Sequence, residues 1–226
     1  MPLVSIIIPT LNEERNLPIV LDDIEKTMKA VKKDYEIIIV DGHSKDDTVE
    51  IAKKYKAKIV YDRIGKGSAL RTGIHEAKGD IIVMMDADCS HRSSEIRLMI
   101  EAINTGYDVC MGSRFIQGGG TADMTFHRRV GNKFFVSLVN FFWHMDYSDL
   151  CYGYRAFSKK AAHIIFPLLK CDGFGIETEI SIKAAKKKLK VLEIPSYEKR
   201  RLHGKGNLRS FSDGARILKT IKRELF

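Results

Sequence analysis

The chain has 226 residues, of which 44% are hydrophobic and 30% are charged, as in an ordinary globular domain. No apolar run approaches the roughly 18 residues that a membrane-spanning helix needs, so no transmembrane segment is expected. The four cysteines are scattered without a metal-binding spacing, which favours a reducing compartment. Met1-Pro2-Leu3 leads directly into a predicted strand without the basic region of a signal peptide, and a cytoplasmic protein is therefore expected.

The net charge of +9 is concentrated near the C-terminus. Residues 183–223 carry 14 Lys and Arg residues against 3 Asp and Glu residues. A basic segment of this kind suits nucleic acid, an anionic membrane or a phosphorylated substrate. The run Lys186-Lys187-Lys188 by itself is typical of a solvated helix face.

The first 90 residues alternate between short apolar runs and helical patterns. Apolar residues recur at helical spacing from Leu17, after Asn16 as a predicted N-cap, and Ser44 with Asp47 fits a capping box. A third helix, after the one that the capping box begins, is predicted over residues 68–77. The alternation predicts an α/β fold with a mostly parallel sheet and helices on both faces. The strands that we expect in this part of the chain are Val4–Pro9, Glu36–Val40, Lys58–Tyr61 and Ile81–Met85.

Charged residues follow several of these strands. Asp86 and Asp88 are separated by one residue, so strand alternation predicts that both point to the same side. They either hold a divalent cation with a diphosphate or form a solvated strand end. Asp41 ends the second strand, and Lys66 lies between two glycines that suit close approach to a charged ligand. The loop after the first strand lacks glycine, which counts against a dinucleotide-binding Rossmann unit.

The second half contains an arginine-rich and aromatic stretch. A strand over Asp108–Gly112 leads to Arg114, and three glycines follow at 118–120, either as a mobile segment or as a plain surface loop. Arg128 and Arg129 precede a predicted helix, Lys133–His144, with five aromatic residues. An aromatic helix of this kind is typical of a membrane interface or of a buried core or dimer contact.

Four further elements are predicted towards the C-terminus. Glu177 and Glu179 open a helix ending near Lys188, where acidic residues suit the helix dipole. The other three are a strand at Tyr152–Phe157, a strand at Lys190–Lys199 and a basic amphipathic helix at Leu208–Phe226.

The chain resembles the family-2 glycosyltransferases with a GT-A fold, and its second half looks like the dolichol-phosphate mannose and glucose synthase branch. The resemblance covers roughly residues 3 to 205. Cys89-Ser90-His91-Arg92-Ser93 stands where mannose synthases usually carry Gln followed by His-Pro-Pro, so mannose and glucose both stay open. The matching motifs are Pro9-Thr10-Leu11-Asn12-Glu13, residues 40–48, Gly65-Lys66-Gly67, Met85-Asp86-Ala87-Asp88, Gly112-Ser113-Arg114-Phe115, residues 149–157 and Glu193-Ile194-Pro195.

The resemblance implies one continuous GT-A (Rossmann-like) domain with a nucleotide-sugar-binding half, 1–115, and an acceptor-binding half, 116–226. Asp86 and Asp88 would hold Mg²⁺ or Mn²⁺ and the donor diphosphate. Arg114 and one of Arg128 and Arg129 would meet the acceptor phosphate. The residues implied to bind the nucleoside or the donor diphosphate are Pro9, Asn12, Glu13, Asp41, Lys66, Arg201 and Lys205.

These features predict a metal-dependent, inverting hexosyltransferase at the cytoplasmic face of a membrane. The donor would be a GDP-mannose or UDP-glucose type of nucleotide sugar, and the acceptor dolichyl or another polyprenyl phosphate. Transfer to a sugar hydroxyl is the alternative, with Asp149 as the general base that a hydroxyl requires. A non-catalytic membrane- or nucleic-acid-binding relative is a further alternative, although the intact Asp41, Asp86 and Asp88 argue against it, and nucleic acid is not expected as a partner.

Overall fold

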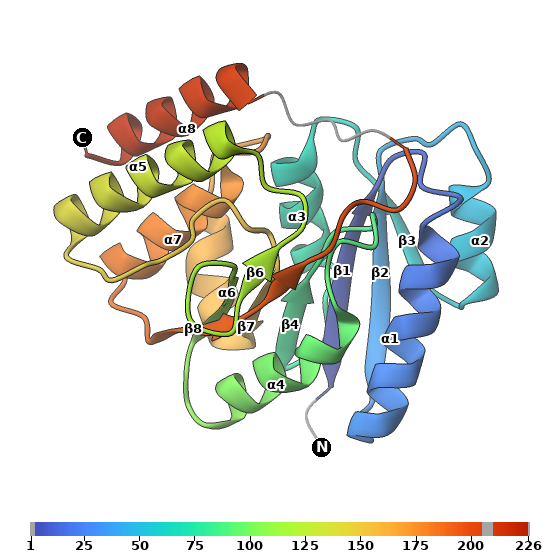
Figure 1. Cartoon of the computed structure of the whole chain (residues 1–226). Coiled ribbons are helices and arrows are strands. Elements are labelled where there is room, and N and C mark those ends of the chain that lie inside the picture. Colours follow the sequence, from blue (N-terminus) through green and yellow to red (C-terminus); the bar gives the residue numbers. More distant parts are fainter. Residues whose placement is uncertain (1–2, 205–209, 226) are drawn as a thin grey trace.

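The computed structural model describes residues 3–204 and 210–225, which are built around a seven-stranded sheet (Figure 1). The strand order is β3-β2-β1-β4-β7-β5-β8, and β7 is antiparallel to both of its neighbours. The other pairs are parallel, as the alternating sequence predicted. The strands are β1 (Val4–Thr10), β2 (Tyr35–Asp41), β3 (Lys58–Tyr61), β4 (Ile81–Met84), β5 (Val109–Ser113), β7 (Arg155–Ser158) and β8 (Val191–Pro195).

Helices cover both faces of this sheet (Figure 1). Strand alternation divides the apolar side chains between two cores, so that Ile6 and Ile8 face one side while Ile7 faces the other. The first core contains α1 (Leu17–Val31), α2 (Thr48–Lys54) and α4 (Ile96–Asn104). The second contains α3 (Lys66–His75), α6 (Lys159–Ile165), α7 (Ile176–Lys186), α5 (Phe126–Trp143) and α8 (Ser210–Leu225).

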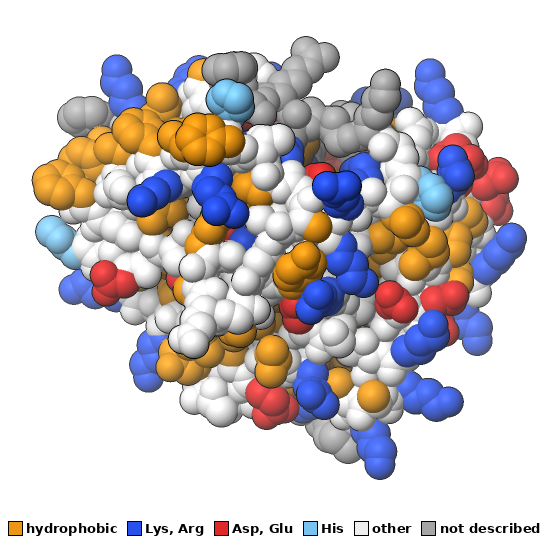
Figure 2. Space-filling view, in the orientation of Figure 1, with side chains coloured by type: hydrophobic (Ala, Val, Ile, Leu, Met, Phe, Trp, Pro, Cys, Tyr) orange, Lys and Arg blue, Asp and Glu red, His pale blue; other side chains and the backbone are white. Residues whose placement is uncertain are grey.

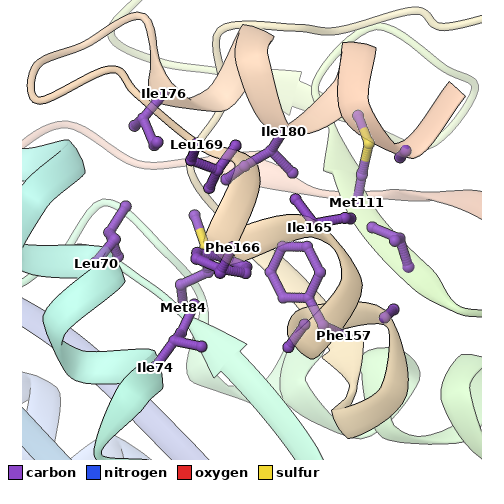
Figure 3. Close-up of a cluster of buried hydrophobic side chains, with 14 of the residues drawn as sticks. Leu70, Ile74, Met84, Met111, Phe157, Ile165, Phe166, Leu169, Ile176 and Ile180 are labelled. Atoms are coloured by element: carbon purple, nitrogen blue, oxygen red, sulfur yellow. The ribbon is translucent and has the colours of Figure 1, made fainter. Parts of the chain in front are cut away.

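The second core is centred on Phe157 of β7 (Figure 3). Its ring meets Phe166 at 5.4 Å between centroids in an edge-to-face arrangement. Figure 3 shows apolar side chains from α3, β4, α6 and α7 converging on these rings. The core therefore joins elements from the first and second halves of the chain.

Several predicted boundaries are wrong, and each error has a local cause. The aromatic helix begins at Phe126 because Thr125 caps it, with the Thr125 side chain accepting from the Arg128 N–H. The predicted capping box fails because Asp47 is the N-cap of α2 without a side-chain cap, and Ser44 bonds Asp41 instead. The predicted strand over 190–199 divides at Ser196. Its second part, β9 (Tyr197–Glu198), pairs with β6 (Gly120–Thr121) in a separate two-stranded sheet.

The glycine-rich stretch is partly ordered by this small sheet, since Gly120 lies in β6. Leu208 and Phe226, the ends of the predicted terminal helix, lie outside the described residues. Within the ranges that the structure does describe, no helix is both long and apolar enough to cross a bilayer.

Replacing Phe157 by Ala should lower the free energy of unfolding by about 3–5 kcal/mol, because a large cavity opens in the second core. Urea denaturation measures this loss. Phe141 of α5 is the matched control, since its side chain is 74% exposed, and Phe141→Ala should change stability by no more than about 0.5 kcal/mol. Equal losses for the two variants would contradict the placement of Phe157 at the centre of the core.

Candidate active site

A cleft of about 820 Å³ lies at the carboxyl ends of β1, β2 and β4. Open α/β sheets bind ligands at this edge. The cleft walls come from both halves of the chain, including Pro9 and Glu13 from the loop after β1, Arg114 after β5, Arg128 on α5 and Ile217 on α8. A ligand in the cleft would therefore touch both halves.

The loops that follow β1, β2 and β4 share a tight backbone geometry. Asn12, His43 and Cys89 each have a positive φ, between 56° and 66°. Non-glycine residues adopt this region at a cost and are enriched at functional sites. Three strand-end loops bordering the cleft are thus held in sharp, specific turns.

Asp41 and Asn12 hold two of these loops together behind the cleft wall. Asp41 is buried and accepts hydrogen bonds from Thr10 Oγ1 and from the Ser44 hydroxyl. Ser44 Oγ accepts from the Asn12 N–H at 2.8 Å, and Asn12 Oδ1 accepts from the Lys45 N–H. Of the residues predicted to bind the nucleoside, Pro9 and Glu13 line the cleft, whereas Asp41 and Asn12 shape the loops behind it.

Lys66 joins Asp86 to the start of α7. Its Nζ lies 2.8 Å from Asp86 Oδ1 and 2.9 Å from Glu177 Oε1. Burial opposes the charge of Lys66, but the two carboxylates outweigh burial and raise its pKa. Burial likewise opposes ionisation of Asp86, yet the charge of Lys66 outweighs it and holds the pKa of Asp86 at about 2. Gly153 makes room for this cluster, because a Cβ there would lie 3.0 Å from Lys66 Nζ.

The glycines beside Lys66 have a packing role besides the predicted one, which stays a prediction. They were expected to allow close approach of a charged ligand. A Cβ on Gly65 or Gly67 would instead collide with the backbone of residues 171–172, and the Gly67 N–H donates to Asp172 O at 2.8 Å. The glycines therefore dock the start of α3 on the loop before α7, which brings Lys66 to Glu177.

Asp88 is paired with the loop that follows β9. Arg201 reaches Asp88 Oδ2 at 3.3 Å and Glu13 Oε1 at 2.8 Å. The same loop is fastened by Asn16, whose Oδ1 accepts from the His203 N–H. Asn16 occupies the predicted N-cap position of α1, but its side chain serves this loop rather than the helix. Lys205, predicted to cover the diphosphate beside Arg201, lies outside the described residues.

His91 supports Asp86 from beneath, a role that sequence inspection missed. The Asp86 N–H donates to His91 Nδ1 at 3.1 Å, which assigns the ring proton to Nε2. The ring stacks on Tyr154 at 4.6 Å and meets Tyr152 edge-on at 4.8 Å. Burial lowers the pKa of His91, so the ring is neutral at neutral pH.

Arg114 lies between two carboxylates on the opposite side of the cleft. Its Nε and Nη2 donate to Asp149 at 2.7 and 2.9 Å, and its Nη1 donates to both oxygens of Glu198 at 3.1 Å. Its guanidinium carbon lies 4.7 Å from the centroid of the Tyr152 ring. Asp149, the candidate general base, is buried within this pair, which leaves it badly placed to accept a substrate proton.

Arg128 and Arg129 are separated by the geometry of α5. Arg128 lines the cleft, whereas Arg129 is exposed and lies over the Phe115 ring at 5.9 Å. Neighbouring helical residues point about 100° apart, so one of the two must leave the site. Of the two predicted residues, Arg128 is therefore the one that lines the cleft, and its role in binding a ligand stays a prediction.

The loop before β7 lines the cleft together with Arg114 and Arg128. Asn132 Oδ1 accepts from the backbone N–H groups of Leu150 and Cys151, each at 3.1 Å. The buried Arg155 donates to the carbonyls of Leu150 and Tyr152. Asn132 and Arg155 thus fix the segment that carries Tyr152 and Gly153.

The carboxylate oxygens of Asp86 and Asp88 are suitable ligands for a divalent cation that also binds a diphosphate. Mg²⁺ typically takes one or two carboxylates, with phosphate oxygens and water completing its shell. Asp86 and Asp88 both line the cleft, and no cluster of three or more His, Cys, Asp or Glu side chains suited to a metal occurs in the described part of the chain. Among described residues the lining is also richer in acidic than in basic side chains: Glu13, Asp62, Asp86, Asp88, Asp123, Glu177, Glu198 and Asp213 against Arg63, Lys66, Arg114, Arg128, Arg200 and Arg201. A cation bound by Asp86 and Asp88 would reduce this excess of negative charge.

Residues 5–166 match the family model described as "Glycosyl transferase family 2". The chain belongs to this family. It is 36% identical over 200 residues to a dolichol-phosphate mannosyltransferase of Pyrococcus furiosus. The aligned region covers 85% of this chain and 55% of that protein. It is 31% identical over 223 residues to the glycosyltransferase AglJ of Haloferax volcanii, covering 97% of this chain and 71% of that protein. The chain thus spans about half of the first relative.

The solved structures support the GT-A-like fold. Glucosyl-3-phosphoglycerate synthase from Mycobacterium tuberculosis, solved in complex with Mn²⁺, UDP and glucosyl-3-phosphoglycerate, matches with a TM-score of 0.77. The match covers 99% of this chain and 80% of that chain at 20% sequence identity. At this identity the likeness concerns the fold, and the predicted single α/β domain is confirmed. The division into donor and acceptor halves at residue 115 stays a prediction.

Replacing Lys66 by Met should lower the free energy of unfolding by about 3–5 kcal/mol, because the buried Glu177 is left as an uncompensated charge and the partly buried Asp86 loses its ion pair. Adding Glu177→Gln to this variant should restore part of the loss, since one of the unpaired charges disappears. Urea denaturation of the two single variants and the double variant measures the coupling. Strictly additive losses would show that Lys66 and Glu177 do not interact.

Proposed function

We propose that this protein transfers a hexose, mannose or glucose, from a nucleoside-diphosphate sugar to a polyprenyl phosphate of the dolichyl type, with inversion at the sugar carbon. The observation that carries the proposal is that one cleft joins the Asp86 and Asp88 carboxylates to Arg114 and Arg128. The dolichol-phosphate mannosyltransferase relative supports the acceptor class. The Mn²⁺ and UDP in the complexes of the glucosyl-3-phosphoglycerate synthase support a metal-dependent nucleotide-sugar donor.

The donor would lie along the side of the cleft formed by the loops after β1 and β4. Asp86 and Asp88 would hold Mg²⁺ or Mn²⁺, which supplies charge neutralisation for a leaving diphosphate. Lys66 and Arg201 already contact these two carboxylates and are placed to bind diphosphate oxygens. His91 keeps the Asp86 backbone in position throughout, because its bond to the N–H does not involve the carboxylate.

The acceptor phosphate would approach from the side of Arg114 and Arg128. One of its oxygens attacks the anomeric carbon from the face opposite the diphosphate. A new carbon–oxygen bond forms, the bond to the diphosphate breaks, and the nucleoside diphosphate leaves. A phosphate monoester has a second pKa of about 6, so the nucleophile is already largely deprotonated at neutral pH. Positioning by arginine is then more important than a general base. This agrees with the geometry of Asp149, whose carboxylate is already bound to Arg114.

The outer face of α5 offers a surface for the lipid part of the acceptor. Figure 2 shows hydrophobic side chains gathered over this helix, with Lys and Arg side chains beside them. Phe126, Val130, Phe134 and Phe141 are exposed along α5, while Phe135 and Val139 are buried beneath them. Basic side chains on the outer side of α8 are also exposed, namely Arg216, Lys219 and Lys222.

These two helices also line the cleft, through Arg128 and Asn132 of α5 and Gly214 and Ile217 of α8. A polyprenyl chain whose phosphate is bound in the cleft can therefore leave along an apolar helix face. Aromatic side chains flanked by cations suit the surface of an anionic membrane, where each basic residue adds about 1 kcal/mol. We propose peripheral attachment to the cytoplasmic membrane face through this surface.

The proposal is tested by incubating the protein with GDP- and UDP-sugars, Mg²⁺ or Mn²⁺ and a polyprenyl phosphate, followed by mass spectrometry of the lipids. A glycosyl phosphoryl polyprenol should form with one class of donor. Parallel reactions with sugar acceptors that carry only hydroxyl groups serve as the comparison. Transfer to these acceptors, without transfer to the lipid phosphate, would refute the proposed acceptor.

Replacing Asp88 by Ala should reduce transfer more than 100-fold, because the donor diphosphate loses part of its cation site. The wild-type activity should vanish in chelator and return with Mg²⁺ or Mn²⁺. Glu101→Ala, on the exposed side of α4, is the control. Full turnover of the Asp88 variant, or of the wild type in chelator, would remove the metal from the mechanism.

Replacing Phe126, Phe134 and Phe141 by Ser should weaken binding to anionic liposomes and slow transfer to long-chain acceptors, because these side chains form the exposed apolar surface of α5. Transfer to short, water-soluble acceptors should be much less affected. Liposome sedimentation and acceptor-dependent rates measure the two effects. Unchanged liposome binding by the folded triple variant would exclude α5 as the membrane surface.

A further inference from the structure

The charge of Arg114 is already shared between two carboxylates that differ in how firmly they are held. Asp149 is fully buried, binds Arg114 through two guanidinium nitrogens and the backbone N–H, and accepts in addition from the Cys151 N–H. Its own N–H donates to Glu193, which also accepts from Ser148. Asp149 is therefore a fixed part of the framework behind the arginine.

Glu198 approaches the same guanidinium from the cleft. It contacts a single nitrogen, Nη1, and its side chain is 17% exposed. It lies on β9, which belongs to the small β6–β9 sheet rather than to the main sheet. Thr121 of β6 donates to Glu198 Oε2 at 2.5 Å. Glu198 thus lines the cleft and accepts from the one guanidinium nitrogen of Arg114 that Asp149 does not contact.

A phosphate that binds Arg114 from the cleft must meet Glu198. The guanidinium binds anions through its planar array of N–H donors, and Glu198, which lines the cleft, accepts from Nη1, the guanidinium nitrogen that Asp149 does not contact. Two like charges on one arginine edge repel each other, and the cleft already holds more acidic than basic side chains among the described residues. Either the phosphate displaces Glu198, or it binds weakly.

We propose that the Glu198 carboxylate occupies the position on Arg114 where the acceptor phosphate binds. Binding of the acceptor then requires that Glu198 is displaced. The inference rests on the proposed function, in which Arg114 receives the acceptor. It assigns Glu198 as a residue that sets affinity and selectivity for the acceptor anion. A neutral acceptor cannot take its place on the arginine, whereas a phosphate monoester can. Donor binding lies on the side of Asp86 and Asp88 and should not depend on Glu198.

The test is Glu198→Gln, which keeps the size of the side chain and an oxygen that can accept from Arg114 and Thr121 but removes the negative charge. Calorimetry with farnesyl phosphate, a water-soluble prenyl phosphate, should show a Kd about tenfold lower than in the wild type, equivalent to about 1.4 kcal/mol. The KM for this acceptor should fall likewise, while kcat and the KM for the donor stay within about twofold. Glu101→Gln is the matched control and should change none of these values.

A second arm separates a direct effect on Arg114 from a general change in cleft charge. In an Arg114→Met background, Glu198→Gln should give no more than a twofold gain, because the arginine for which the anions compete is absent. An unchanged or weaker affinity in Glu198→Gln would overturn the proposal, as would a full gain without Arg114. The absence of sugar transfer by the wild type, by contrast, would count against the proposed function, and the calorimetric comparison would still decide the role of Glu198.

Discussion

Three cations in the cleft each lie between two carboxylates: Lys66, Arg114 and Arg201. Burying such charges is unfavourable unless each is compensated closely, so the pairs fix one another's positions. The partners come from distant segments, as when Lys66 of α3 links the end of β4 to the start of α7. These clusters hold the walls of the cleft in register before any substrate arrives.

The same ion pairs determine which charged groups of the cleft are available to bind a ligand. A cation already bound to a carboxylate is not free for a phosphate, and a carboxylate already bound to an arginine is not free for a metal. Binding of a metal–diphosphate at Asp86 and Asp88 would exchange one set of ion pairs for another, releasing Lys66 and Arg201 next to the incoming charge. Under the proposed function, ion pairing would thus be conserved when the metal–diphosphate binds, and no isolated buried charge would be left.

Much of this arrangement could be predicted from the residues themselves, and the remainder depended on contacts far apart in the chain. The parallel strands were predictable because apolar runs alternate with helical patterns, and Asp86, Asp88 and Lys66 were found because strand ends meet at one edge. Glu177 was interpreted as a helix-dipole residue because nothing in its neighbourhood reveals Lys66, over 100 positions away. Glu198 was missed for a similar reason, since Arg114 is 84 positions away. His91 lies only five positions from Asp86, but its contact depends on how the loop after β4 folds back, which the residue pattern does not reveal. The start of α5 was missed because Thr125 gives only a weak capping signal.

The antiparallel strand β7 has a consequence for how the molecule can move. It hydrogen-bonds to β4 on one side and to β5 on the other, so a strand from the second half of the chain is inserted into the sheet of the first. A hinge between two lobes would have to break this ladder, together with the core around Phe157. Under the proposed function, substrates would therefore enter and leave by rearrangement of loops and side chains at the rim, over a platform on which the proposed donor and acceptor regions keep a constant separation.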